Sequence, residues 1–212
     1  KTHRELTAWL AKTLRARIVV PDYRLAPEHP YPAAPDDVMS VYQGLLASGV
    51  SSNNIVIIGD SAGGNLAMVT LRRLKALGER LPAGAVLYSP WVDLRCMTES
   101  YVTKQSADPM LSGPWLRKMR EFYCQGEALN NPDISPVLSD FSGMPPILIH
   151  VGSEEVLLND SLLLARHLKE QGGGVQLKVW EKLWHVFQAQ VEFFQPARQS
   201  VHETSDFLAS VF

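Results

Sequence analysis

Ser61 is the residue of this sequence whose surroundings most clearly favour chemistry. It stands in the pattern Gly-x-Ser-x-Gly, between Gly59 and Gly63. An apolar run rich in β-branched residues precedes it at residues 55–58 and a helical pattern follows it, so we expect a strand, a tight turn and a helix. We expect Gly59 and Gly63 to remove side-chain bulk that would clash at this turn. The turn would hold the hydroxyl at the tip of a sheet as a nucleophile, with the backbone N–H of Ala62 aimed at an oxyanion formed beside it.

A serine hydroxyl needs a base to take its proton, and His185 is the histidine that we expect to do so. It follows residues 175–180, the last predicted strand, and it is flanked by large apolar residues. An enzyme with the chain order serine, acid, histidine would place its base here. The other five histidines have structural explanations on helix surfaces, in a buried strand or in a proline-rich loop: His3, His29, His150, His167 and His202.

An acid that orients the imidazole is expected after residues 147–151, another apolar strand. Three carboxylates compete there: Glu154, Glu155 and Asp160. Asp160 has an alternative explanation as the N-cap of the following helix. Glu154 and Glu155 both come directly after the strand, and the chemistry of the residues leaves the choice between them open.

The elements that must position these side chains alternate between strands and helices. We predict strands at residues 18–20, 55–58, 85–88, 147–151 and 175–180. We predict helices at about residues 2–16, 35–46, 62–77, 160–171 and 196–211. This alternation predicts an α/β fold with a mostly parallel sheet, in which a site lies at the carboxyl ends of the strands. Ser61 is at that edge.

Two segments stand out from this alternation. From about residue 92 to residue 146 the pattern loosens into polar loops and prolines around one helix, predicted at 114–123. An irregular stretch of this length is more often functional than accidental. Residues 175–180 alternate strictly between apolar and polar types, which predicts an edge strand that could pair with a second copy of the chain.

Composition fits one globular domain, since the 212 residues are 46% hydrophobic and carry a net charge of −2. The sequence has no run of Lys and Arg, which argues against binding to nucleic acid or to an anionic membrane surface. No stretch approaches the roughly 20 apolar residues that a membrane span requires. The only two cysteines, Cys96 and Cys124, predict neither a disulfide framework nor a metal cluster. We therefore expect a cytoplasmic protein without a metal or cofactor.

Three motifs together resemble the hormone-sensitive-lipase-like esterases of the α/β-hydrolase fold. They are Asp-Tyr-Arg-Leu-Ala-Pro-Glu at residues 22–28, Gly-Asp-Ser-Ala-Gly-Gly at residues 59–64 and His-Val-Phe at residues 185–187. The resemblance extends over essentially all 212 residues. The acid motif of the family, Asp-x-Leu-x-Asp, falls on residues 155–159, which implies that Glu155 is the acid, with glutamate in place of the usual aspartate. The resemblance also implies helices on both faces of the sheet, and relatives often dimerise through the strand that corresponds to residues 175–180.

The resemblance implies hydrolysis of a small carboxylic ester with a short acyl chain, through an acyl-enzyme formed on Ser61 with the help of His185 and Glu155. Candidates for an apolar substrate pocket, each with core packing as its alternative, are Trp91, Leu111, Trp115, Trp184 and Phe187. One alternative function is a non-catalytic small-molecule receptor, such as the plant gibberellin receptors, which resemble this family but lack the base histidine. Another is an amidase or serine peptidase with the same triad. The presence of His185 favours an enzyme.

One motif of the family is not found in this sequence. Relatives carry a His-Gly-Gly-Gly segment, which supplies further oxyanion donors, just ahead of the helix that corresponds to residues 2–16. We therefore expect residues 1–212 to be an incomplete α/β-hydrolase domain with a cap-like insertion at about residues 92–146. The expected missing parts are N-terminal strands, one of them interior to the sheet, and part of the cap.

Overall fold

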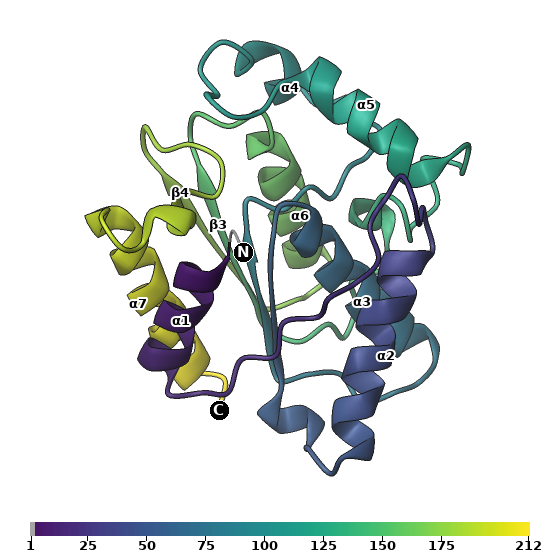
Figure 1. Ribbon diagram of the computed structural model, residues 1–212, viewed down its shortest axis with the longest axis vertical. Helices are drawn as coiled ribbons and strands as arrows, with labels where there is room; N and C mark the ends of the chain where they lie inside the picture. The colour runs from purple at the N-terminus through teal and green to yellow at the C-terminus, as the bar shows by residue number, and fades with distance from the viewer. Residues whose placement is uncertain (1–2) are drawn as a thin grey trace.

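The computed structural model describes residues 3–212, which contain a sheet of four parallel strands (Figure 1). The strands lie side by side in the order β1 (Val56–Asp60), β2 (Gly84–Tyr88), β3 (Ile147–Gly152) and β4 (Val175–Trp180). Gly59 pairs with Leu87 between the first two strands, and Ile149 pairs with Leu177 between the last two. The predicted α/β fold with a parallel sheet is confirmed, and β4 lies at an edge as predicted.

The described residues also form seven α-helices. They are α1 (Arg4–Leu14), α2 (Ala33–Ala47), α3 (Ala62–Ala76), α4 (Ser100–Thr103), α5 (Gly113–Cys124), α6 (Leu158–Glu170) and α7 (Gln195–Ala209), with 3-10 helices at Ser52–Asn54, Pro136–Leu138 and Phe187–Gln190. The predicted helices all form, with ends that differ by a few residues. The sequence pattern does not predict α4, which is a single turn. None of the helices described for residues 3–212 is long and apolar enough to cross a membrane.

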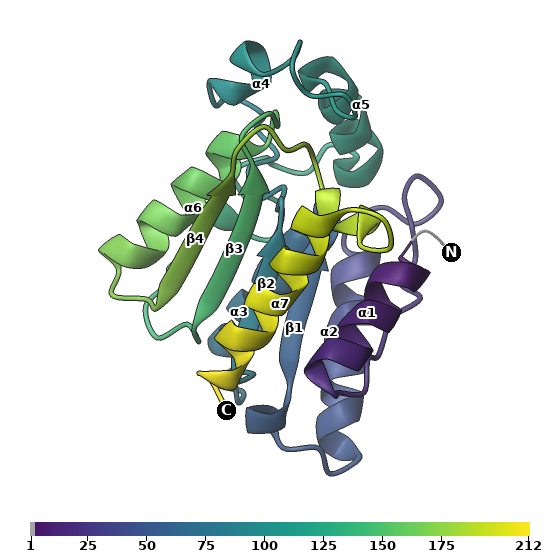
Figure 2. The same ribbon diagram turned by 90° about the vertical axis from the view of Figure 1, so that its left-hand side faces the viewer.

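Different helices cover the two faces of the sheet (Figure 2). The side chains of β2 alternate between the faces, as they do in any strand. Ala85 and Leu87 join a core cluster with residues of α3 and α6, whereas Val86 and Tyr88 join a second cluster with residues of α1 and α7. Helices on both faces, which the family resemblance implies, are therefore confirmed.

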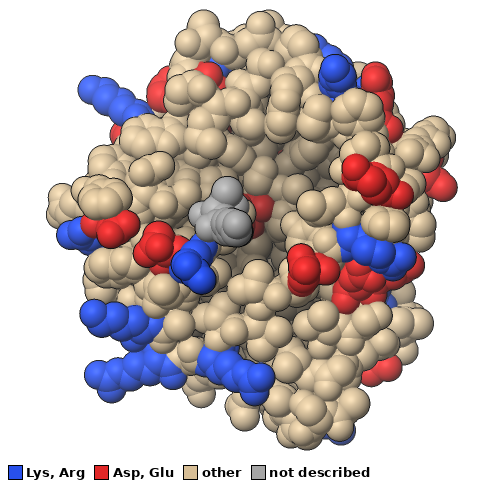
Figure 3. Space-filling view, viewed as in Figure 1, with Lys and Arg blue, Asp and Glu red and all other residues tan. Residues whose placement is uncertain are grey.

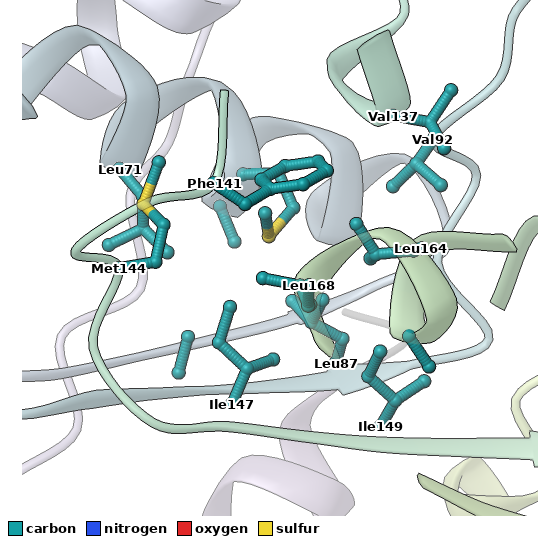
Figure 4. Packing of buried hydrophobic residues seen from close by; sticks show 14 residues of the cluster. Leu71, Leu87, Val92, Val137, Phe141, Met144, Ile147, Ile149, Leu164 and Leu168 are labelled. Atoms are coloured by element: carbon teal, nitrogen blue, oxygen red, sulfur yellow. The ribbon is translucent and has the colours of Figure 1, made fainter. Parts of the chain in front are cut away.

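Figure 4 shows the core between the sheet and the helices α3 and α6. Leu71 of α3 and Leu168 of α6 pack in the same cluster as Leu87 and Ile149 of the strands. Phe141, from the segment that leads into β3, is fully buried in this cluster. Because each such side chain stabilises the fold by about 1.5–3 kcal/mol when it leaves water, these contacts fix the helices on the sheet.

Residues 18–20 do not form the predicted strand. Val20 is 63% exposed, and Ile18 instead packs against the core cluster that contains α1 and α7. A strand needs a neighbour with which it exchanges backbone hydrogen bonds, and this segment pairs with none of the four strands. The prediction was wrong because a β-branched run supplies propensity but no partner.

The part of the 92–146 segment that carries α4 and α5 lies beyond the carboxyl ends of the strands (Figure 2), whereas its last residues, among them Phe141 and Met144, pack against the face of the sheet and lead into β3. It contains α4 and α5, and α5 is the helix predicted at residues 114–123. The Ser112 side chain caps this helix by accepting a hydrogen bond from the Trp115 N–H. Leu94, Tyr101 and Leu116 belong to a separate core cluster beneath it. The segment thus shares an apolar cluster with Val156 and Leu157, on the side of the sheet where Ser61 follows β1.

Candidate active site

Ser61 occupies the turn between β1 and α3 in a conformation that residues other than glycine rarely adopt. Its φ and ψ are 54° and −118°. Such a backbone costs of the order of 1–3 kcal/mol and persists only where the surroundings fix it. Here the Ser61 N–H donates to the Tyr88 carbonyl at 2.9 Å, and the Ser61 carbonyl accepts from the N–H groups of Gly64 and Trp91, each at 3.0 Å. The turn predicted from the Gly-x-Ser-x-Gly pattern is therefore present and is anchored on the loop after β2.

Gly59 and Gly64 allow the chain to pack this tightly around Ser61. A Cβ atom at Gly59 would lie 2.2 Å from the Gly63 carbonyl oxygen, and one at Gly64 would lie 2.6 Å from Pro90 Cβ. At Gly63, by contrast, the nearest such contact is 3.9 Å, to the Asp60 side chain. The expectation that Gly63 removes clashing bulk was wrong, and its neighbour Gly64 has that role because α3 passes close to the loop after β2.

Ala62 is the first residue of α3. The N–H groups in the first turn of a helix have no acceptor within the helix, and the helix dipole makes that end partly positive. The Ala62 N–H therefore has the chemical character of an oxyanion donor beside Ser61, although its part in a reaction stays a prediction.

The structure brings Glu155 and His185 together. Glu155 Oε2 lies 2.9 Å from His185 Nδ1, and both side chains are buried. When Nδ1 donates its proton to this carboxylate, Nε2 is left as the nitrogen that can accept one. Among the described residues no hydrogen bond joins the Ser61 hydroxyl to this imidazole, as is common for such contacts before a substrate binds.

The other two carboxylates considered from the sequence serve other contacts. Glu154 forms an ion pair with Lys104 at 3.4 Å on the surface. Asp160 is fully buried, and its Oδ2 accepts hydrogen bonds from the N–H groups of Val92 and Asp93. Burial, which disfavours the charged form, raises the Asp160 pKa well above its usual range.

Asp160 is also not the predicted N-cap of α6. It lies in the first turn of that helix, whose N-cap is Leu157 with no side-chain cap. Its carboxyl group binds the start of the 92–146 segment instead, because the loop after β2 passes directly over this end of α6.

Three of the remaining histidines contact groups outside the Glu155–His185 pair. His150 is buried in β3 with Nδ1 2.7 Å from Ser200 Oγ, and burial lowers its pKa to about 4. His3, at the start of α1, is exposed and its Nε2 lies 2.9 Å from Asp60 Oδ2, a contact that raises the His3 pKa. His167 of α6 contacts the Val137 carbonyl.

The candidate pocket residues occupy three different environments. Phe187 is fully buried and packs against Trp180, with ring centroids 5.3 Å apart, which fits the alternative of core packing. Trp91 is also mostly buried, in the core of the 92–146 segment. Trp184 stacks on Phe194 at a centroid distance of 5.3 Å.

Leu111 and Trp115 do line a common groove of about 310 Å³ in the 92–146 segment. Trp115 is 49% exposed, which is unusual for so large an apolar side chain. In the space-filling view the surface below α4 and α5 is hollowed and largely free of charged side chains (Figure 3).

Two residues of the site escape the sequence analysis. Ser89, directly after β2, contacts Glu155, and its φ of 48° is positive. Gly152 ends β3, and a Cβ atom there would lie 2.2 Å from the Leu183 carbonyl oxygen, so only glycine lets the loop of His185 approach this strand. The signal available in the sequence is positional, since both residues end apolar strands on the edge that carries Ser61.

Comparisons with known proteins agree with this geometry. A family model described as the alpha/beta hydrolase fold matches residues 1–189. An esterase of Acinetobacter venetianus is 37% identical over 211 residues, which are 99% of this chain and 70% of that protein. An acetyl-hydrolase of Streptomyces hygroscopicus is 36% identical over 98% of this chain and 70% of its own length.

A solved structure of a hormone-sensitive lipase from a metagenome library is 42% identical and superposes with a TM-score of 0.96, over 99% of this chain and 72% of that one. An esterase/lipase from an uncultured bacterium superposes with a TM-score of 0.95 at 36% identity. The family match and the structural similarity thus assign the present chain to the α/β-hydrolase fold. Within that fold, the chain belongs to the hormone-sensitive-lipase-like esterases.

Proposed function

We propose that the protein is a carboxylesterase that hydrolyses short-chain acyl esters with Ser61 as nucleophile, His185 as base and Glu155 as the acid that orients the base. The observation that carries this proposal is the buried hydrogen bond between Glu155 and His185, at the edge of the sheet where Ser61 is held in a strained turn. Esterase activity among the relatives supports the same reaction class.

In the proposed mechanism, Ser61 Oγ attacks the ester carbonyl carbon while His185 Nε2 takes the hydroxyl proton. The carbonyl π electrons move onto the oxygen, and the Ala62 N–H stabilises this oxyanion. The intermediate collapses with loss of the alcohol, which receives the proton from Nε2, and leaves an acyl group on Ser61. A water molecule then attacks the acyl-enzyme in the same way, and the acid leaves.

Glu155 has two roles in this scheme. Its Oε2 keeps Nδ1 protonated, so that Nε2 is the basic nitrogen, and its charge stabilises the imidazolium that forms in each half of the reaction. Glutamate has one methylene more than the usual aspartate, and the 2.9 Å contact is compatible with that extra reach.

The preference for a short acyl chain rests on relatives and on the groove at Leu111 and Trp115. An acetyl-hydrolase and, at 29% identity, an ethyl acetate hydrolase of Pseudomonas putida act on acetyl groups according to their names. The groove has a volume of about 310 Å³, and Met110, Leu111 and Trp115 contribute apolar side chains to its wall. We propose that it contacts the acyl group.

Ser61→Ala in the full-length protein tests the proposal. We expect hydrolysis of p-nitrophenyl acetate to fall by at least about 10³-fold, because no other group on the sheet edge replaces the nucleophile. Ser161→Ala is a matched control, since Ser161 is a fully buried serine whose hydroxyl lacks a hydrogen-bond partner in the described residues. Retention of most activity in Ser61→Ala would refute the assignment.

The alternative functions are tested with the wild-type protein. Faster turnover of a matched anilide than of the ester would indicate an amidase, and binding of the ester without turnover would indicate a receptor.

We also propose a homodimer through the outer edge of β4. This edge has no strand partner in the described residues, and a hollow of about 380 Å³ between β4 and α7 is lined by Gln176, Lys178 and Phe207, among others. Unpaired strand edges are ready sites for pairing with another chain. Light scattering should give a mass of two chains, and a monomeric mass at micromolar concentration would contradict the proposal.

A further inference from the structure

Ser89 lies at the centre of the contacts that hold the Glu155–His185 pair. It follows β2, is fully buried, and has a φ of 48°. Its N–H donates to the carbonyl of His150 in the adjacent strand at 2.8 Å. This bond ties Ser89 to the end of β3, and the positive φ sets the direction in which its side chain leaves the backbone.

The Ser89 hydroxyl contacts both halves of the pair. Its oxygen lies 2.7 Å from Glu155 Oε1 and 3.1 Å from the backbone nitrogen of Val186, the residue directly after His185. A backbone N–H can only donate, so Ser89 Oγ must accept the hydrogen bond from Val186. The single proton of the hydroxyl is then free for Glu155, which fixes the direction of both bonds.

This arrangement assigns different partners to the two carboxylate oxygens. Glu155 Oε1 accepts from the Ser89 hydroxyl and from the Gly152 N–H at 2.6 Å, whereas Oε2 faces His185 Nδ1 at 2.9 Å. With Oε1 held from two sides, the carboxylate cannot rotate away from the imidazole. Val186 itself has a φ of 47°, so its N–H is directed by an equally constrained backbone.

We propose that Ser89 is a positioning residue of the esterase reaction, which orients the acid and the loop of the base through one hydroxyl group. The inference rests on the proposed function. Ser89 touches neither the substrate nor the reacting atoms, and it acts through Glu155 and His185.

A double-mutant cycle of Ser89→Ala and Glu155→Gln tests this proposal, with p-nitrophenyl acetate as substrate and the full-length protein. We expect Ser89→Ala alone to lower kcat by about 10- to 100-fold with KM changed less than about twofold, because small misplacements of catalytic groups cost rates of this size. In the Glu155→Gln background, the same substitution should lower kcat by less than about threefold. An equal loss in both backgrounds, or no loss in the wild-type background, would overturn the proposal.

Ser89→Gly separates positioning from stability. Glycine also lacks the hydroxyl, but it adopts a positive φ without strain. We therefore expect Ser89→Gly to unfold at a higher temperature than Ser89→Ala and yet to share its loss of kcat. If activity instead follows the unfolding temperature, Ser89 has a structural role only.

The controls distinguish the failure of this inference from the failure of the proposed function. Ser161→Ala should retain wild-type kcat and KM, because its hydroxyl makes no hydrogen bond in the described residues. If Ser61→Ala is inactive and Ser89→Ala is fully active, only the role of Ser89 is refuted. If Ser61→Ala remains active, the esterase assignment itself fails.

Discussion

The contacts that hold α3 and α6 on the sheet differ from the hydrogen bonds that hold the segment at residues 92–146 beside Glu155. Between the sheet and α3 or α6 the contacts are apolar side chains such as Leu71, Leu87 and Ile149, all fully buried. The 92–146 segment shares apolar clusters with the rest of the molecule, through Phe141 and Val156 among others, but buried side-chain hydrogen bonds join it to the chain as well. Asp108 Oδ2 accepts from the Val156 N–H at 3.0 Å, and the Ser100 hydroxyl donates to the Val156 carbonyl at 2.7 Å.

The hydrogen bonds of the 92–146 segment matter because they are made to the residue next to Glu155. Val156 directly follows Glu155, so both backbone groups next to the proposed catalytic acid are bound by the 92–146 segment. Apolar packing is non-directional and tolerates small shifts, whereas hydrogen bonds fix distance and angle. The sheet therefore supplies stability, and the hydrogen bonds set the position of the segment relative to the acid.

Among variants that test this comparison, we expect Leu71→Ala to have the largest effect on the free energy of unfolding. Removal of this buried side chain should lower the free energy of unfolding by about 2–5 kcal/mol through lost burial and the cavity left behind. Esterase activity well below the unfolding midpoint should stay within about twofold of wild type. Leu77→Ala, at the exposed end of the same helix, is the matched control, and equal destabilisation by both variants would contradict the comparison.

His150, a buried polar residue of β3, should make stability depend on pH. Burial lowers its pKa to about 4, with Glu203 acting to raise it and Lys178 to lower it. The unfolded state, with a pKa near 6.5, binds more protons between these values, so stability is lost as the pH falls from about 6.5 towards 4, by up to about 3 kcal/mol. Urea unfolding at several pH values should show a flatter profile for His150→Gln. An unchanged slope would assign the loss to other groups.

A smaller loss of stability, but a clear loss of activity, is expected for Asp108→Ala. Its carboxylate accepts hydrogen bonds from the N–H groups of Met110, Leu111 and Val156. We expect a loss of about 1–3 kcal/mol in unfolding free energy and of about tenfold in kcat/KM. Lys104→Ala, which removes only the surface ion pair to the neighbouring Glu154, should change stability by less than about 1 kcal/mol and leave kcat/KM unchanged. Similar results for the two variants would show that Asp108 has no directional role.

Much of the fold follows from the sequence because it depends on local periodicity. The strands that become β1 to β3 are largely apolar runs bounded by turn residues, β4 alternates between apolar and polar residues, and the long helices have apolar faces at helical spacing. Residues 18–20 show the limit of that reasoning, since no strand of the described chain pairs with them.

The sequence predicts those residues of the candidate site that belong to a recognisable motif. Ser61 follows from its turn, and the Glu155–His185 contact follows from the family motif, although the residues alone could not separate Glu155 from Glu154. Ser89 and Asp160 could not be found in this way, because their roles depend on loops that meet only in the folded chain. Their local sequence indicates a strand end and a helix start, respectively, and nothing more.

The two cysteines give the 92–146 segment a built-in chemical reporter. Cys96 and Cys124 are the only thiols of the sequence, both belong to the core of this segment, and burial raises the pKa of each to about 11. At neutral pH such thiols are protonated and shielded, so a thiol reagent modifies them only when the segment opens. The rate of labelling thus measures the opening of this segment separately from unfolding of the sheet, and a ligand that orders the segment will slow it.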